Sequence, residues 1–270
     1  MKPTFVPKDS LAAIMIEPVQ GAAGCRPALP EFMKYLRETA DDLGALLLID
    51  EVMTSRLGPS VVTAALGLKA DLMALGKWIG GGMTFGAFGG RRDIMEMFDP
   101  ARGTKGLMHL GTYNNNVFSM SAGIVGLDIF KREKVEELNA RGDRMRAEIT
   151  RVFFEMGIYA QEHANHLEDV IEVDSFEGNT RLYKGNDEII PLPKVFISGC
   201  GSMLNVRFAG SDTSLWHNLY YHYMLDHGIY LASRGYTPLN LEITDGNVDK
   251  FVGVLKEVLA LHISDLTIEQ

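Results

Sequence analysis

The sequence predicts an α/β fold for the first half of the chain and an α+β fold for the second half. Short apolar runs alternate with amphipathic segments over residues 11–75. This alternation of strand and helix indicates a parallel sheet with right-handed crossover connections. From residue 115 onward the alternation stops, and a length of 270 residues fits about two domains. We therefore predict a division into residues 1–130 and 131–270.

The elements of the first half follow from apolar patterning and from glycine and proline positions. The run before Glu17 has the profile of a strand buried on both faces. A helix is predicted to begin at Pro30 and to close at Gly44. Seven glycines between residues 76 and 90 indicate a shaped loop with one short strand at Ala87–Gly89. The other predictions are strands over Leu11–Ile16, Ala45–Ile49 and Asp71–Leu75 and helices over Pro30–Leu43 and Ala64–Leu68.

In the second half, longer helical patterns surround fewer strands. A polar segment with several prolines and glycines predicts a long irregular loop over Gln161–Lys194. Its flanking elements are predicted as helices over Val117–Phe130, Val135–Met156, Thr213–His227 and Asn247–Leu261 and strands over Ser202–Phe208 and Gly228–Ala232.

Composition excludes several classes of protein. Apolar residues make up 46% and charged residues 23%, which is typical of a folded soluble chain. The net charge of −9 argues against a nucleic-acid binder. No apolar run approaches the ~20 residues of a membrane helix, and the first ten residues resemble no targeting signal. Two cysteines, Cys25 and Cys200, indicate reduced thiols. We expect a cytoplasmic protein without membrane or nucleic-acid partners.

Polar residues follow each of the three predicted strands. They are Glu17, Asp50 and, just past Leu75, Lys77. In open α/β sheets ligands bind beyond the carboxyl ends of the strands. A lysine there is able to form a Schiff base, and an aspartate is able to hold a proton on a heteroaromatic nitrogen. Taken singly, Asp50 fits a turn cap and Lys77 fits solvated surface. Their conjunction beside a glycine-rich loop favours a cofactor site.

Four ordered motifs carry a family resemblance. They are Glu17-Pro18-Val19-Gln20-Gly21, Asp50-Glu51-Val52-Met53-Thr54, Leu75-Gly76-Lys77-Trp78-Ile79-Gly80-Gly81-Gly82 and His109-Leu110-Gly111-Thr112. In this order they resemble the class III pyridoxal-phosphate-dependent aminotransferases. Within that family, the Gly80–Gly82 run and residues 86–91 are most similar to glutamate-1-semialdehyde 2,1-aminomutase.

The resemblance implies a fold, a reaction and a set of site residues. The fold is the C-terminal portion of a fold-type-I transferase, with an incomplete parallel-sheet large domain and an α+β small domain. Lys77 matches the catalytic lysine that holds pyridoxal 5'-phosphate as an aldimine and moves the substrate proton. Asp50 matches the partner of the ring nitrogen, Val52 the residue against the ring face, and Thr112 a phosphate contact made across a dimer interface. The implied partners are small amino and keto substrates and a second copy of the chain.

Departures from the family motifs bear on specificity. Ala22 stands where ornithine-type members carry glutamate, and Met53 matches the aminomutases. Arg234 has no secure match to a carboxylate-binding arginine, and Glu17 is interpreted as structural. Transaminase and aminomutase activities both stay open.

The N-terminal part of the family domain, with its phosphate-binding turn, has no counterpart in the sequence. This leaves two readings: an active aminotransferase or aminomutase, and a truncated non-catalytic protein that pairs with a full-length homologue. A metal site at Glu162, His163 and His166 is the least favoured alternative, since loop histidines are mostly solvated, so no metal is expected.

Overall fold

The structure, a computed structural model, describes residues 10–58, 61–160, 181–184, 188–191 and 193–267. It divides into two compact units. The first comprises Met1–Val19 and Ala28–Glu136, and the second comprises Gln20–Pro27 and Glu137–Gln270. Each unit is described separately below. The division at residue 130 expected from the sequence stays a prediction.

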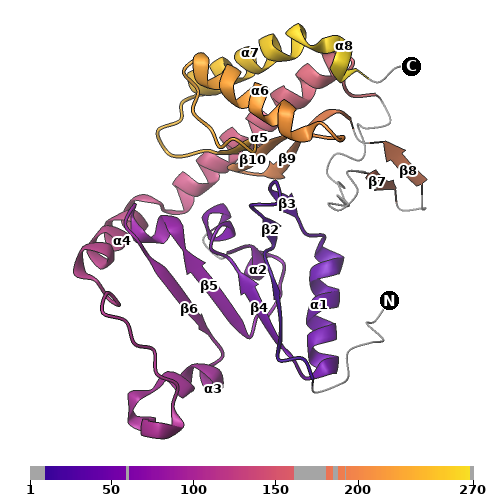
Figure 1. Ribbon diagram of the computed structural model, residues 1–270. Helices are drawn as coiled ribbons and strands as arrows, with labels where there is room; N and C mark the ends of the chain where they lie inside the picture. The colour runs from indigo at the N-terminus through magenta and orange to yellow at the C-terminus, as the bar shows by residue number, and fades with distance from the viewer. Residues whose placement is uncertain (1–9, 59–60, 161–180, 185–187, 192, 268–270) are drawn as a thin grey trace. The chain divides into compact units, whose positions relative to one another are not determined.

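A four-stranded sheet forms the centre of the first unit, in the order β1-β4-β5-β6 (Figure 1). Strands β1, β4 and β5 run parallel, and β6 is antiparallel to β5. Asp50 at the end of β4 lies opposite Ala74 of β5. The strands cover Ala13–Ile16 (β1), Leu46–Asp50 (β4), Leu72–Gly76 (β5) and Gly86–Gly90 (β6).

Helix α1 (Pro30–Leu43) covers one face of this sheet. Leu47 and Ile49 of β4 are fully buried in one cluster with Met33 and Ala40 of the helix. The helix ends as predicted, because Gly44 adopts φ 69° and its N–H bonds back to the last turn. Alternate residues of β4 thus face α1, and Asp50 projects from the other side of the sheet.

A buried carboxylate ties α1 to the sheet. Asp71 accepts hydrogen bonds from the Leu47 backbone N–H at 2.8 Å, from Arg37 at 2.8 Å and from Arg91 at 2.9 Å. Burial alone would raise the pKa of Asp71, but these three donors outweigh it and lower the pKa to about 2. The carboxylate therefore stays ionised between the strand ends and α1.

Short helices and one long helix complete the first unit. Helix α4 begins at an N-cap, Asn116, whose side chain accepts hydrogen bonds from the backbone N–H groups of Phe118 and Ser119. The elements are η1 (Thr54–Leu57), α2 (Val61–Ala65), η2 (Lys77–Gly80), α3 (Arg92–Met95), η3 (Glu96–Phe98), η4 (Pro100–Lys105) and α4 (Val117–Ile129).

The second unit packs helices on a three-stranded antiparallel sheet of order β11-β10-β9. Phe153, Ile197, Val206, Tyr220 and Leu255 expose at most 3% of their surface and form part of its core. Its elements are most of α5 (Arg132–Glu155), β9 (Val195–Cys200), β10 (Met203–Phe208), α6 (Thr213–Asp226), β11 (Tyr236–Pro238), α7 (Asp245–Leu261) and α8 (Ile263–Leu266). Two-stranded pairs are formed by β2 (Val19–Gln20) with β3 (Arg26–Pro27) and by β7 (Arg181–Lys184) with β8 (Glu188–Pro191).

Three expectations about the strands are wrong. Strand β1 is not buried on both faces: it pairs only with β4 among the described residues, and Met15 is 63% exposed. Residues 228–232 form no strand, because the β10 partner is Tyr236–Pro238. Part of the expected irregular loop is the β7–β8 hairpin, while residues 161–180, with Glu162, His163 and His166, lie outside the described residues.

Cys25 and Cys200 form no disulfide in the described part of the chain. In the part of the chain that the structure describes, no helix is both long and apolar enough to cross a membrane.

Candidate active site

The carboxyl end of β4 holds the first predicted site residue. Asp50 is half-buried, and its Oδ1 accepts a hydrogen bond from the Val52 backbone N–H at 2.9 Å. This local turn fixes the carboxylate orientation. Within the described part of the chain the other carboxylate oxygen has no hydrogen-bonding partner. Asp50 is thus an oriented acceptor with one oxygen available.

Lys77 follows the neighbouring strand, three residues beyond the partner of Asp50. With strands about 4.8 Å apart and a rise of about 3.3 Å per residue, the two Cα atoms lie about 11 Å apart. Lys77 has φ 55°, a left-handed conformation that costs a non-glycine residue about 1 kcal/mol or more. Its side chain is exposed, and no acidic partner neutralises it among the described residues. Strain of this kind is commonest at functional sites.

Val52 lies beside the end of β5. A Cβ added at Gly76 would be 3.5 Å from Cγ1 of Val52 and 3.3 Å from the carbonyl oxygen of Phe85. Glycine at position 76 therefore leaves no side chain between Val52 and the carbonyl group of Phe85. The structure brings three of the four predicted residues, Asp50, Val52 and Lys77, to one edge of the sheet.

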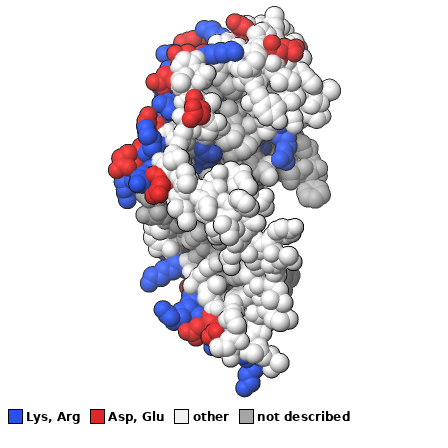
Figure 2. Space-filling model, turned by 90° about the vertical axis from the view of Figure 1, so that its left-hand side faces the viewer, with Lys and Arg blue, Asp and Glu red and all other residues white. Residues whose placement is uncertain are grey.

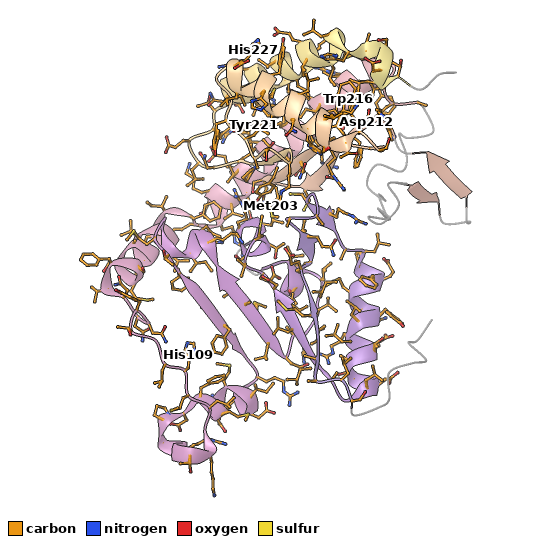
Figure 3. All side chains as sticks on the ribbon, in the orientation of Figure 1. His109, Met203, Asp212, Trp216, Tyr221 and His227 are labelled. Carbon is orange, nitrogen blue, oxygen red and sulfur yellow. The ribbon has the colours of Figure 1, made fainter. Side chains whose placement is uncertain are left out.

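Thr112, the fourth predicted residue, lies elsewhere on the first unit. It is exposed in a turn in which the Asn114 N–H donates to the Gly111 carbonyl at 3.0 Å. The preceding His109 packs edge-on against Phe88 of β6, with ring centroids 5.2 Å apart (Figure 3). No hydrogen bond or ring contact joins Thr112 to the other three residues in the described ranges.

Glu51 is a buried residue whose role the sequence analysis missed. Its side chain is 0% exposed and accepts hydrogen bonds from the Thr54 hydroxyl and from the hydroxyl and backbone N–H of Thr63. It thereby fixes the loop that follows Asp50. The available signal in the sequence was that Thr54 and Thr63 follow Glu51. Their hydrogen bonds to Glu51 depend on the fold, however.

The lysine turn is held from two sides. Trp78 donates a hydrogen bond to the Ser55 hydroxyl at 2.9 Å, and its ring meets the ring of Phe130 edge-on at 4.9 Å. Glycines bring the backbone of α4 directly against this turn. A Cβ at Gly81 would lie 2.0 Å from the Ala122 carbonyl oxygen, and one at Gly123 would lie 2.6 Å from that of Ile79. The position of Lys77 is thus set by neighbouring backbone.

The chain also matches known proteins. The family model for class III aminotransferases matches residues 5–153. The chain is 37% identical over 264 residues to a β-phenylalanine transaminase of Variovorax paradoxus, which covers 93% of this chain and 52% of the relative. A glutamate-1-semialdehyde 2,1-aminomutase of Methanosarcina acetivorans is 39% identical over 153 residues, 56% of this chain and 35% of that relative.

Solved structures agree on the fold. The crystal structure of a β-phenylalanine aminotransferase from Variovorax paradoxus superposes with a TM-score of 0.78 at 35% identity, over 96% of this chain and 54% of that one. A transaminase solved with PLP bound superposes with a TM-score of 0.76 at 26% identity, over 96% of this chain and 54% of that one. The predicted fold class, part of a fold-type-I transferase, is confirmed.

The matched fold is thus a transferase fold, and in this chain the edge of its α/β sheet carries Lys77. The chain belongs to the class III aminotransferase family. It spans about half the length of the V. paradoxus transaminase that it matches.

Proposed function

We propose that the first unit binds pyridoxal 5'-phosphate and serves a pyridoxal-phosphate-dependent transamination or aminomutase reaction. The observation that supports this most is the placement of Asp50 and Lys77 at the carboxyl ends of adjacent parallel strands. A pyridine aldehyde requires a carboxylate that accepts the N–H of its ring nitrogen and an amine that binds its aldehyde carbon. An oriented carboxylate and an uncompensated amine are these two groups.

Each residue has a distinct role in this proposal. The free oxygen of Asp50 accepts the N–H of the ring nitrogen and keeps that nitrogen protonated. Lys77 Nζ would hold the aldehyde carbon covalently, and its free amine would be the base that accepts the proton of the substrate Cα. Val52 packs against a ring face, and Thr112 contacts the phosphate of the cofactor held by a second copy of the chain, across a dimer interface. When bound, the cofactor supplies an electron-poor ring that stabilises negative charge at the substrate Cα.

The substrates in this proposal are small amino donors and keto acceptors. The β-phenylalanine transaminase and the aminomutase among the relatives support both an intermolecular and an intramolecular amino transfer. We place the protein in the cytoplasm, where its free thiols stay reduced.

Covalent labelling of Lys77 tests the proposal. The full chain is incubated with pyridoxal phosphate, reduced with borohydride and mapped by peptide mass spectrometry. We expect an absorption band at the edge of the visible range and a reduced adduct on Lys77. Lys77→Ala should abolish both, whereas Lys69→Ala, at an exposed lysine of the same unit, should keep both. Equal labelling of Lys77 and Lys69 would refute the proposal.

An apolar surface of the first unit supports pairing with a second chain, either another copy of this chain or, in the second candidate role, a full-length homologue. Figure 2 looks onto the side that carries α4, and the surface there is largely free of charged side chains. We call this the α4 surface; it includes Met108 (82% exposed), Leu110 (81%), Tyr113 (83%), Val117 (72%), Phe118 (75%) and Ile124 (63%). Six large apolar side chains that are each 63% or more exposed within residues 108–124 are typical of an interaction site. It also surrounds Thr112, so we propose that it is the homodimer interface.

Light scattering during gel filtration distinguishes the two roles. A dimer that Phe118→Asp dissociates, and that Tyr230→Asp in the second unit leaves intact, supports the homodimer. A chain that stays monomeric alone but elutes with a full-length class III aminotransferase supports the non-catalytic pairing role.

A further inference from the structure

The two charged groups of the proposed site lie on two separate loops. Asp50 ends β4, and Lys77 directly follows the neighbouring strand β5 (Figure 1). The backbone ladder between these strands continues as far as the N–H of Glu51, which donates to the Ala74 carbonyl at 3.0 Å. Lys77 lies three residues beyond Ala74, so the ladder does not by itself fix the distance between the carboxylate and the amine.

A side-chain hydrogen bond joins the two loops beyond the ladder. The indole N–H of Trp78, the residue after Lys77, donates to Oγ of Ser55 at 2.9 Å. Ser55 is 5% exposed and lies in η1, where its backbone N–H donates to the Glu51 carbonyl at 3.0 Å. We call the indole–hydroxyl bond the Trp78–Ser55 link. One end of it is adjacent to Lys77, and the other is bonded to the residue that follows Asp50.

Both ends of the Trp78–Ser55 link are held in place. The Trp78 ring meets the Phe130 ring edge-on, with centroids 4.9 Å apart. At the other end, Glu51 is 0% exposed, and its carboxylate accepts hydrogen bonds from two threonine hydroxyls. An indole side chain has only two rotatable bonds, so little conformational entropy is lost when it is fixed. The link is therefore a stiff connection between the two loops.

Lys77 needs support of this kind. Its φ of 55° is a left-handed conformation, which a residue other than glycine keeps only where its surroundings hold it. Trp78 is the next residue along the chain, so a fixed indole also fixes the backbone that carries the amine. Without the link, this turn would lose one of the contacts that hold it, and the lysine side chain would point in a wider range of directions.

We propose that Trp78 is a positioning residue that, through Ser55, sets the separation between Asp50 and Lys77. This role rests on the proposed function, in which the ring nitrogen and the aldehyde carbon of one molecule meet these two groups. Because an aromatic ring has a fixed span, both contacts form only when the carboxylate and the amine are held within about 0.5 Å of the right geometry. In this assignment Trp78 and Ser55 do not themselves contact the cofactor.

Titration of the full chain with pyridoxal phosphate, followed by absorbance, tests this assignment. Trp78→Phe removes the indole N–H but retains an aromatic ring, and Ser55→Ala removes the acceptor. We expect each variant to raise the dissociation constant about fivefold, the factor for one neutral hydrogen bond, and the double variant to raise it no further. Effects that multiply in the double variant, or an unchanged constant in folded Trp78→Phe, would overturn the proposal.

The second tryptophan provides a matched control. Trp216 also donates its indole N–H to a side chain, Asp212, at 2.8 Å, but it lies in the second unit. Trp216→Phe should therefore leave the dissociation constant unchanged, and a fivefold rise in it as well would contradict the specific role of Trp78. Far-UV circular dichroism checks that each variant is folded.

Hydrogen exchange of the chain without cofactor separates this inference from the proposed function. Mass spectrometry follows the amides of residues 51–57 and 76–82. We expect Trp78→Phe and Ser55→Ala each to speed exchange in both segments, and Trp216→Phe in neither. An effect confined to the segment that carries the substitution would overturn the proposal. If exchange rises in both segments but the unaltered chain forms no adduct on Lys77, the proposed function fails and the link between the two loops stands.

Discussion

The backbone N–H of Thr63 donates a hydrogen bond to Oε1 of Glu51 over 2.7 Å and so closes the loop between β4 and α2. The same carboxylate accepts from the hydroxyls of Thr54 and Thr63. Asp50 and Val52 flank Glu51, so the geometry of the candidate site depends on a residue that faces away from it.

Removing the Glu51 carboxylate should destabilise the first unit. Glu51→Ala leaves buried donors of Thr54 and Thr63 unpaired, and we expect a loss of about 3 kcal/mol in the free energy of unfolding. The chain has two tryptophans, one in each unit, so Trp78 fluorescence in a Trp216→Phe background reports the first unit alone. Glu38→Gln, at an exposed side chain, should change the urea midpoint little. Equal effects of the two substitutions would contradict the role of Glu51.

Asp71 should make the first unit sensitive to acid. Its pKa is lowered from 3.8 to about 2, so its stabilising contribution is complete above 3.8 and is lost as pH falls toward 2. Asp71→Asn should flatten this dependence and cost about 3 kcal/mol at pH 7, because it breaks a buried ion pair. Asp41→Asn removes only an exposed partner of Arg37 and serves as the control. Identical acid unfolding of the unaltered chain and Asp71→Asn would disprove the assignment.

Asp50→Asn should weaken cofactor binding without unfolding the chain. Asparagine retains an oxygen for the Val52 N–H but loses the charge that holds the ring N–H. We expect the dissociation constant for pyridoxal phosphate to rise about tenfold or more, measured by absorbance titration. Asp41→Asn should leave this constant unchanged. An Asp50→Asn chain that binds the cofactor normally would remove Asp50 from the site.

Two glycine substitutions in helices should have opposite effects. Gly253 in α7 has no atom within 4 Å of an added Cβ, so Gly253→Ala should stabilise the second unit by about 1 kcal/mol. In Gly123→Ala the new Cβ meets the Ile79 carbonyl oxygen at 2.6 Å, and we expect a loss of about 2 kcal/mol in the first unit. Trp216 and Trp78 fluorescence report the two units. Stabilisation by both substitutions would show that α4 does not pack on the lysine turn.

His217 should make the second unit less stable in mild acid. Burial, and then the charge of Arg207, lower the pKa of His217 from 6.5 to about 4. The unfolded chain therefore takes up this proton first, and stability should fall as pH drops from 6.5 to 4. His217→Gln should remove that slope, whereas His222→Gln, at an exposed histidine, should not. Proton NMR titration that gives His217 an ordinary pKa would contradict its burial.

Local signals predicted some elements closely. Pro30 and Gly44 bound α1 because both act through their own backbone dihedral angles. Strand β9 was not predicted, although it pairs with β10 through a local turn in which Cys200 lies opposite Met203. Residues 228–232 were wrongly assigned as a strand, because the pairing of Tyr236–Pro238 with β10 joins residues that are distant in sequence. The exposure of β1 likewise depends on which strands flank it.

Pairs of distant residues differ in the same way. The placement of Asp50 and Lys77 at one edge of the sheet was predictable, because Asp50 directly follows an apolar run, Lys77 follows another after a single glycine, and parallel strands align such positions. The packing of Gly24 against Arg207 was not, because the two residues meet only in the folded chain.

The glycine contacts between α4 and the turn after β5 leave no compressible side chains between these two stretches of backbone. If a second chain binds at the α4 surface as proposed, any displacement of α4 would be passed to the Lys77 turn through contacts between backbone atoms alone.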